Sequence, residues 1–209
     1  MRTIFITIFE GVEVKNILRT PILENLLKEG GIRIVLFTKS VEKLDFYKKE
    51  FNDPRILFEV VEWKSKSFVD NLFAKLKFVL LRTKTTDLKR KLVCQYEKKY
   101  LRYLSGRLIN MIFAWPIFRK IARFIDFALV KDDTFKTFFD KYNPDLVFMA
   151  HLFDEPEIAM LREAKKRNIK TVGFINSWDK VTARCMLRLL PNKLIVFNNI
   201  VKKELIDFN

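Results

Sequence analysis

Short, continuously apolar runs alternate with amphipathic segments in the first third of the chain. Strands are predicted at 3–9, 32–38 and 55–63, because each run is apolar or nearly so throughout. Helices are predicted at 21–29 and 40–51. Thr20 and Pro21 support the first helix, since threonine is a good N-cap and proline fits the first helical position. This alternation is typical of a parallel sheet with helices on both faces.

The alternation stops after the third predicted strand and returns near residue 145. Residues 64–144 show long helical patterns rich in lysine, arginine and aromatic side chains, without a convincing strand. Further strands are predicted at 145–152, 170–176 and 193–198. Further helices are predicted at 155–168, near 182–190 and at 200–208. We therefore predict one doubly wound, Rossmann-like α/β domain over 1–209, with about six parallel strands and a basic helical insertion at about 64–144.

The composition is that of a folded globular protein, with 49% hydrophobic and 31% charged residues. The formal net charge of +15 is concentrated at 64–131, where 17 lysines and arginines stand against 4 acidic residues. Such a local surplus predicts an anionic partner: membrane lipid, nucleic acid or a phosphorylated substrate. Cys94 and Cys185 match no metal or redox spacing, and the N-terminal apolar run is short, so a cytoplasmic protein without a signal peptide is expected.

Several catalytic fingerprints are absent from the sequence. It contains no GxGxxG, no GxxxxGK[ST], no GxSxG and no D-x-D pair. His151 is the single histidine, so neither a metal site nor a bound cofactor is expected. Any chemistry must therefore come from carboxylates, one imidazole, hydroxyls and backbone dipoles.

Polar residues follow several of the predicted strands. In open parallel sheets, ligands bind outside the carboxyl ends of the strands, so these residues are candidates for one shared crevice. The loop predicted at 10–20 is longer than the roughly 2–6 residues usual for such a connection. The candidates from the predicted loops are Glu10, Gly11, Glu13, Asn16, His151, Ser177, Trp178, Asp179 and Asn198.

Structural roles compete with the functional ones. Asp154 and Glu157 fit a capping box, with aspartate at the N-cap and glutamate three residues later. Asp179 or Ser177 could cap the helix that follows, and Trp178 could be a packing residue. His151 could be a hydrogen-bonded core residue. Both interpretations stay open at each position, Glu10 included.

The stretch at 170–206 resembles the N-terminal half of GT-B-type glycosyltransferases, and more narrowly bacterial surface-polysaccharide enzymes related to glycerophosphotransferases and sugar-nucleotide epimerases. The matching features are a strand, the polar NSWD turn, a short helix, the strand PNKLIVFN and the KKELI helix. The segment KYNPDLVFMAHLFDEPE at 141–157 also fits, with a Pro-Asp step before its strand.

In that family, an N-terminal Rossmann-like domain binds the acceptor and often supplies the catalytic base, and a C-terminal one binds the nucleotide of the donor. The resemblance makes Glu10, His151 and Asp179 the candidate bases, and it places Ser177 and Trp178 on the acceptor side. Gly11, Glu13, Asn16 and Asn198 are further candidate substrate contacts. The donor domain is missing from these 209 residues, so a partner chain or a downstream domain would complete the enzyme.

The segment 107–127 carries the membrane prediction. Arg119, Lys120 and Arg123 share one face of a helix whose remainder is largely apolar, and Pro116 should kink or divide that helix. The uncharged run at 108–118 is too short to span a bilayer, which needs about 20 residues. A basic, aromatic-rich amphipathic helix suits the membrane interface, with Trp115 and these three cations as the contacts. Packing under the chain's own domain and binding of nucleic acid are the alternatives.

Together these features predict the acceptor-binding half of a glycosyltransferase for cell-surface polysaccharide or glycolipid assembly. It would act peripherally on the cytoplasmic membrane face, with a nucleotide sugar as co-substrate and an anionic lipid or polyprenyl-phosphate acceptor as partner. A non-catalytic, membrane-associated binding module is the main alternative, and a nucleic-acid-binding protein is the other. Enzyme activity, the sugar, the acceptor, the stereochemical outcome and the oligomeric state stay open.

Overall fold

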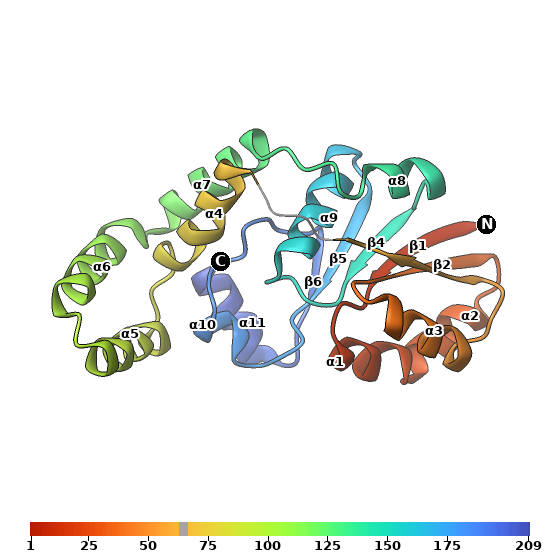
Figure 1. The fold of residues 1–209 in the computed structure, drawn as a ribbon, viewed down its shortest axis with the longest axis horizontal. Coiled ribbons are helices and arrows are strands. Elements are labelled where there is room, and N and C mark those ends of the chain that lie inside the picture. The colour runs from red at the N-terminus through yellow and green to blue at the C-terminus, as the bar shows by residue number, and fades with distance from the viewer. Residues whose placement is uncertain (63–66) are drawn as a thin grey trace. The chain divides into compact units, whose positions relative to one another are not determined.

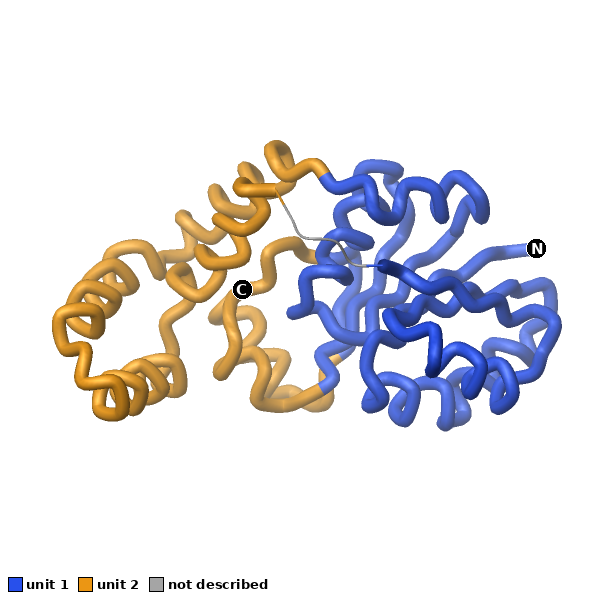
Figure 2. Tube along the Cα trace, viewed as in Figure 1, with its two compact units in different colours: residues 1–65, 132–176, 191–195 blue, residues 66–131, 177–190, 196–209 orange. Residues whose placement is uncertain are grey.

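The computed structural model describes residues 1–62 and 67–209. The chain forms two compact units (Figure 2). Unit 1 comprises 1–65, 132–176 and 191–195, and unit 2 comprises 66–131, 177–190 and 196–209. Unit 2 thus combines most of the predicted insertion with two later segments. Residue 63, the predicted end of the third strand, and residues 64–66, the predicted start of the insertion, lie outside the described residues.

Unit 1 is built on an open, parallel, six-stranded sheet (Figure 1). Its strands are β1 (Arg2–Thr7), β2 (Ile32–Thr38), β3 (Ile56–Val60), β4 (Leu146–Met149), β5 (Lys170–Phe174) and β6 (Lys193–Ile195). Their order across the sheet is β3-β2-β1-β4-β5-β6, and every neighbouring pair is parallel. The α/β prediction with about six parallel strands is therefore confirmed, and the topology is consistent with a Rossmann-like fold.

Helices cover both faces of this sheet (Figure 1). One face carries α1 (Gly11–Glu13), α2 (Pro21–Lys28) and α3 (Val41–Glu50), and the other carries α8 (Lys136–Tyr142) and α9 (Glu155–Lys166). Ile4 and Ile6 of β1 pack in the core with Leu23 of α2, while Phe5 points the other way and stacks edge-on against Phe139 of α8 at 5.1 Å. Both faces of β1 are thus buried, which explains its unbroken apolar sequence.

Unit 2 is helical among the residues that the structure describes. Its helices are α4 (Phe68–Val79), α5 (Lys84–Glu97), α6 (Tyr100–Phe113), α7 (Pro116–Leu129), α10 (Lys180–Ala183) and α11 (Asn199–Phe208). A buried ion-pair group links three of its segments, because the Arg188 guanidinium lies 2.7 Å from both Asp70 of α4 and Asp126 of α7. Each charge is compensated inside the unit, as buried charges require. Among the described helices, none is both long enough and apolar enough to cross a bilayer.

Two segments differ from the sequence prediction. The predicted loop at 10–20 is mostly helical, because α1 continues into the π-helical segment η1 (Val14–Leu18), which buries Val14 and Ile17 in the core. The helix predicted near 182–190 ends at Ala183. Beyond it, the backbone N–H of Met186 donates to the carbonyl of Lys77, so tertiary contacts replace the helical hydrogen bonds there. The predicted effect of Pro116 is confirmed, since α6 ends before it and α7 begins at it.

Gly173 of β5 tests how tightly the sheet packs under the loop that follows β4. A Cβ atom at this position would lie 2.2 Å from Cδ1 and 2.8 Å from Cγ of the buried Leu152. We expect Gly173→Ala to lower the free energy of unfolding by about 1–3 kcal/mol, because overpacking forces side chains off their rotamers. Chemical denaturation measures the change. Gly106→Ala is the matched control, since it has open space on α6 and should stabilise that helix by roughly 0.5–1 kcal/mol.

Candidate active site

The candidate site lies at the carboxyl edge of the sheet, where β1 and β4 are neighbours. The chain runs from β1 to β2 and β3 on one side, and from β4 to β5 and β6 on the other. Open α/β sheets bind ligands outside the carboxyl ends of their strands at such a reversal of strand order. Two segments meet there: residues 8–10 after β1 and residues 150–154 after β4.

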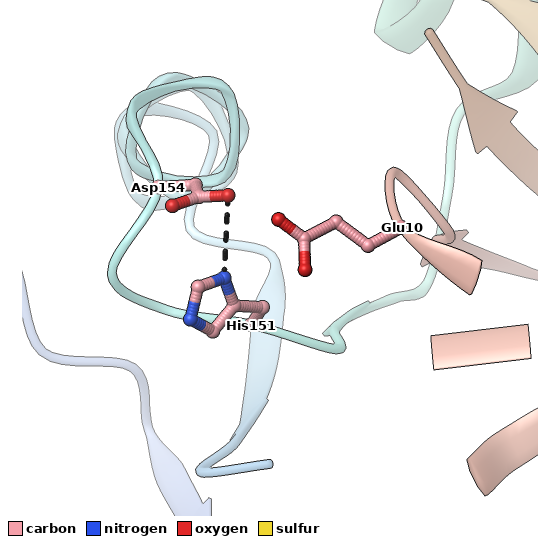
Figure 3. Close-up of side chains that lie close together, drawn as sticks. All are labelled: Glu10, His151 and Asp154. Carbon is pink, nitrogen blue, oxygen red and sulfur yellow. Dashed lines mark ion pairs between the residues drawn. The ribbon is translucent and has the colours of Figure 1, made fainter. Parts of the chain in front are cut away.

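Glu10, His151 and Asp154 gather at this edge (Figure 3). The imidazole is 1% exposed, and its Nδ1 lies 3.3 Å from Oδ2 of Asp154. The Glu10 carboxylate points toward the same nitrogen, while its residue is exposed to solvent. One potential ligand atom from each of the three lies within 4.8 Å of the others. The group therefore combines an exposed carboxylate with a buried imidazole that lies beside an aspartate.

Two buried glutamates lie close to this group. Glu13 of α1 and Glu157 of α9 are 1% and 0% exposed. The Thr7 hydroxyl, at the end of β1, donates to Glu157 and accepts a 2.9 Å hydrogen bond from the N–H of Ala150. The backbone N–H of Glu10 donates to Glu13 at 3.0 Å. One oxygen of each glutamate has no hydrogen-bond partner among the described residues.

The burial of this pair perturbs both carboxyl groups. Burial raises the pKa of Glu13 to about 7, an increase that the charge of Glu10 reinforces and that backbone hydrogen bonds from Glu10 and Phe9 oppose. Burial also raises the pKa of Glu157 well above its ordinary value, and the charge of Glu13 adds to the increase. The pair therefore retains a proton near neutral pH, which is the property that general acids and bases need.

The remaining predicted residues of unit 1 have varied positions. Gly11 lies in α1 and is exposed, and Asn16 lies in η1 and is half-buried. Neither has an ionisable side chain. Glu10 and Glu13 form the reciprocal capping box of α1. The box predicted for Asp154 and Glu157 is wrong: Asp154 stands at the N-cap position of α9 without a capping hydrogen bond from its side chain, and Glu157 accepts from Thr7 instead.

Four predicted site residues belong to unit 2. Asp179 stands at the N-cap position of α10, but its side chain makes no capping hydrogen bond. Its carboxylate instead accepts a hydrogen bond from the Ser177 hydroxyl. Trp178 is exposed, so it is not a core packing residue. Asn198 caps α11 by accepting a 2.9 Å hydrogen bond from the N–H of Val201, a structural role that the prediction did not include. The structure thus assembles Glu10 and His151 within unit 1, whereas Asp179 stays a separate prediction.

The predicted membrane contacts divide into two pairs. Trp115 and Lys120 are exposed. Arg119 is buried and donates to the carbonyl of Ala114 at 3.0 Å, and Arg123 donates to the carbonyls of Leu187 and Asn209 at 2.9 and 2.7 Å. The prediction that Arg119 and Arg123 contact a membrane is therefore corrected, because both guanidinium groups satisfy backbone carbonyls inside unit 2.

The two cavities described in the structure lie elsewhere. One, of about 520 Å³, is at the opposite, amino edge of the sheet and is lined by Arg2, Asp145 and Lys170 among others. The other, of about 430 Å³, lies in unit 2 between α5 and α6. The carboxyl edge is the candidate active site because the perturbed carboxyl groups and the imidazole cluster there, whereas size alone favours the amino-edge cavity.

Sequence reasoning missed Thr7 and Glu157. A threonine that ends an apolar strand gives no signal of its own, and a glutamate three residues into a helix is expected to be a capping residue. Capping was the favoured interpretation of Asp154, with a functional role as the alternative. Its spacing of three residues from His151 across the start of α9 was the one signal in the sequence that could have paired them.

Comparisons with family models, with curated proteins and with solved structures found no match for this chain. The function proposed for it depends on its own residues and their geometry.

The Glu13 carboxyl group should make the stability of the protein depend on pH. Between the ordinary pKa of 4.5 and the folded-state value of about 7, the folded protein binds more protons than the unfolded chain. The free energy of unfolding should therefore fall as the pH rises through this window. We expect Glu13→Gln to be more stable than the wild type at pH 8, by about 1–3 kcal/mol, and equal to it near pH 4.5.

Urea unfolding at several pH values tests this expectation. Glu29→Gln is the control, because Glu29 is an exposed glutamate of the same unit and its replacement should leave the pH profile unchanged. A Glu13→Gln variant that is less stable than the wild type at pH 8 contradicts the buried, proton-binding state of Glu13.

Proposed function

We propose that unit 1 activates an acceptor hydroxyl for glycosyl transfer. The observation that carries the proposal is the convergence of Glu10, His151 and Asp154 at the switch point between β1 and β4. The resemblance of 141–157 and 170–206 to the acceptor half of GT-B-type glycosyltransferases supports the same class of reaction. A donor domain, on this chain or on a partner, would hold the nucleotide sugar.

The three residues have different roles in this proposal. Glu10 is the exposed member and is the group that takes the proton from the acceptor hydroxyl. His151 is buried beside it, with its Nδ1 3.3 Å from Asp154, and is proposed to position Glu10. The acceptor oxygen forms a bond to the anomeric carbon, while the bond from that carbon to the donor's phosphate oxygen breaks and its electron pair leaves with the nucleoside diphosphate.

The surroundings of the base suit this step. Burial keeps a proton on the Glu13 and Glu157 pair near neutral pH, so the pair adds less negative charge to the site than two ionised glutamates would. Positioned general bases contribute about 10²–10⁴-fold to such reactions. The acceptor is proposed to be a hydroxyl on a membrane-bound, polyprenyl-phosphate-linked molecule, and the protein is proposed to act peripherally on the cytoplasmic membrane face.

A second candidate function is a non-catalytic, membrane-associated binding module. It is favoured by the many large apolar side chains that α6 and α7 expose, among them Leu101, Leu104 and Phe124. The two candidates share the membrane and differ at Glu10: a binding module has no use for a base at the carboxyl edge of the sheet.

Glu10→Gln is the decisive variant for the catalytic proposal. In membranes from cells that express the chain, we expect transfer from a panel of labelled nucleotide sugars into the lipid fraction. Glu10→Gln should reduce that transfer by about 10²–10⁴-fold, because glutamine cannot accept the proton. His151→Ala and Asp154→Asn should reduce it less, since they only misplace the base. Glu29→Gln is the matched control and should transfer normally.

Two results would contradict the catalytic proposal. Wild-type transfer in all three site variants would remove Glu10 as the base. If the chain adds no transfer from any sugar of the panel, the binding module is favoured instead. The same assay tests whether Glu10, His151 and Asp154 bind a divalent cation, because carboxylate and imidazole ligands suit such cations. Transfer that resists EDTA assigns the group to proton transfer alone.

A further inference from the structure

Helix α7 turns its polar side toward the interior of unit 2. Arg119, Arg123 and Asp126 share one side of the helix, since they lie four and three residues apart. Arg119 and Asp126 are 6% and 1% exposed. Arg123 donates to Leu187 and Asn209, and Asp126 pairs with Arg188 at 2.7 Å. Each polar group on this side has a partner inside the unit.

The apolar side of α7 consequently faces solvent. Ile117 is 56% exposed, Ile121 is 46% exposed and Phe124 is 76% exposed. These residues are spaced four and three apart, so they form a continuous stripe on one helix face. In a helix that packs on its own domain, the stripe would be buried and the charges would be outside. Helix α7 instead exposes this stripe, while Phe118 and Ala122 pack inside the unit beside the buried charges.

Helix α6 shows a similar arrangement. Asn110 is 1% exposed, and its side-chain amide donates to the carbonyl of Leu81 at 3.0 Å. Leu101, Leu104 and Leu108 lie together on the side of the helix away from Asn110, and they are 85%, 59% and 53% exposed. Trp115, in the two-residue connection between α6 and α7, is 64% exposed. Two successive helices thus each present large apolar residues to solvent, which marks an interaction surface.

The charges around these helices indicate what covers them. Arg102, Arg107 and Lys120 are exposed on α6 and α7, in a region with 17 basic and 4 acidic residues at 64–131. The cavity of about 430 Å³ between α5 and α6 is lined by Lys89, Arg90, Lys99 and Arg102 together with Tyr103 and Ile109. Its one acidic lining residue, Glu97, contacts Lys99 and Arg102, which leaves a surplus of positive charge.

We propose that the apolar stripe of α6 and α7 docks on an anionic membrane, with a lipid phosphate group entering the cavity between α5 and α6. The docked helices lie in the interface, as amphipathic helices with basic flanks do. A second copy of the chain fits this surface less well, because two equally basic faces repel each other. A nucleic acid would leave the aliphatic stripe uncovered. The proposal concerns unit 2 and does not depend on the transferase activity.

Vesicle co-sedimentation of the full chain tests the surface. We expect binding to vesicles of phosphatidylcholine and phosphatidylglycerol, weak binding to phosphatidylcholine alone, and a shift of tryptophan fluorescence to shorter wavelength. The double variant Ile121→Glu, Phe124→Glu should bind at least about tenfold more weakly, because two apolar side chains that would be buried in the bilayer are lost. Its side chains are exposed in solution, so circular dichroism should be unchanged.

Two further variants separate the parts of the proposal. Phe46→Glu is the matched control: Phe46 is 57% exposed on α3 of unit 1, and its replacement should leave vesicle binding unchanged. Lys89→Gln, Arg102→Gln should weaken binding to the anionic vesicles by about fivefold per cation and leave the weak binding to neutral vesicles unchanged.

Three outcomes would overturn the proposal. The first is undiminished binding of Ile121→Glu, Phe124→Glu to anionic vesicles. The second is a dimer of the wild type in sedimentation analysis, without vesicle binding, that is absent from the double variant. That result would make a second copy the occupant of the surface. The third is salt-dependent retention on DNA without vesicle binding, which would assign the basic region to nucleic acid.

Discussion

The pairing of β1 with β4 is the constraint on which the candidate site depends. Residues Ile4, Phe5 and Ile6 align in parallel with Leu146, Val147 and Phe148, although more than 140 positions separate them in the chain. Because the two strands run in the same direction, the segments that follow them leave the sheet at one edge. Every contact between Glu10 and His151, and between Thr7 and Glu157, follows from this register.

The carboxyl edge is organised at a cost to stability. Two glutamates with almost no exposure lie close enough to perturb each other, and one oxygen of each lacks a hydrogen-bond partner among the described residues. A hydrophobic pair of similar volume would be less costly there, since buried carboxylates lose their hydration. Groups kept at such a cost beside an exposed glutamate and a buried imidazole are typical of a functional site, where function opposes stability.

Unit 2 follows the opposite principle from unit 1. In unit 1 the apolar sides of the helices cover a sheet, whereas in unit 2 charged side chains are fixed inside. Arg188 lies between Asp70 and Asp126 and so links α4 to α7, and Arg123 donates to the carbonyl of Asn209. With these charges and the core contacts of Phe118 and Ala122 on its inner side, α7 presents the stripe of Ile117, Ile121 and Phe124 to solvent. The surface proposed for membrane docking is therefore a consequence of the buried ion pairs and these core contacts.

The sequence by itself determined the strands, most helices and the break at Pro116, because continuous apolar runs, N-caps and prolines act within a few residues. It also identified Glu10 and His151 as residues that follow strands. Only the tertiary structure decided that Asp154 lies beside His151, that Thr7 meets Glu157, and that Arg119 and Arg123 point inward. Helical spacing shows which residues share a face but not which face is buried. That choice depended on Leu187 and Asn209, partners more than 60 residues away from Arg123.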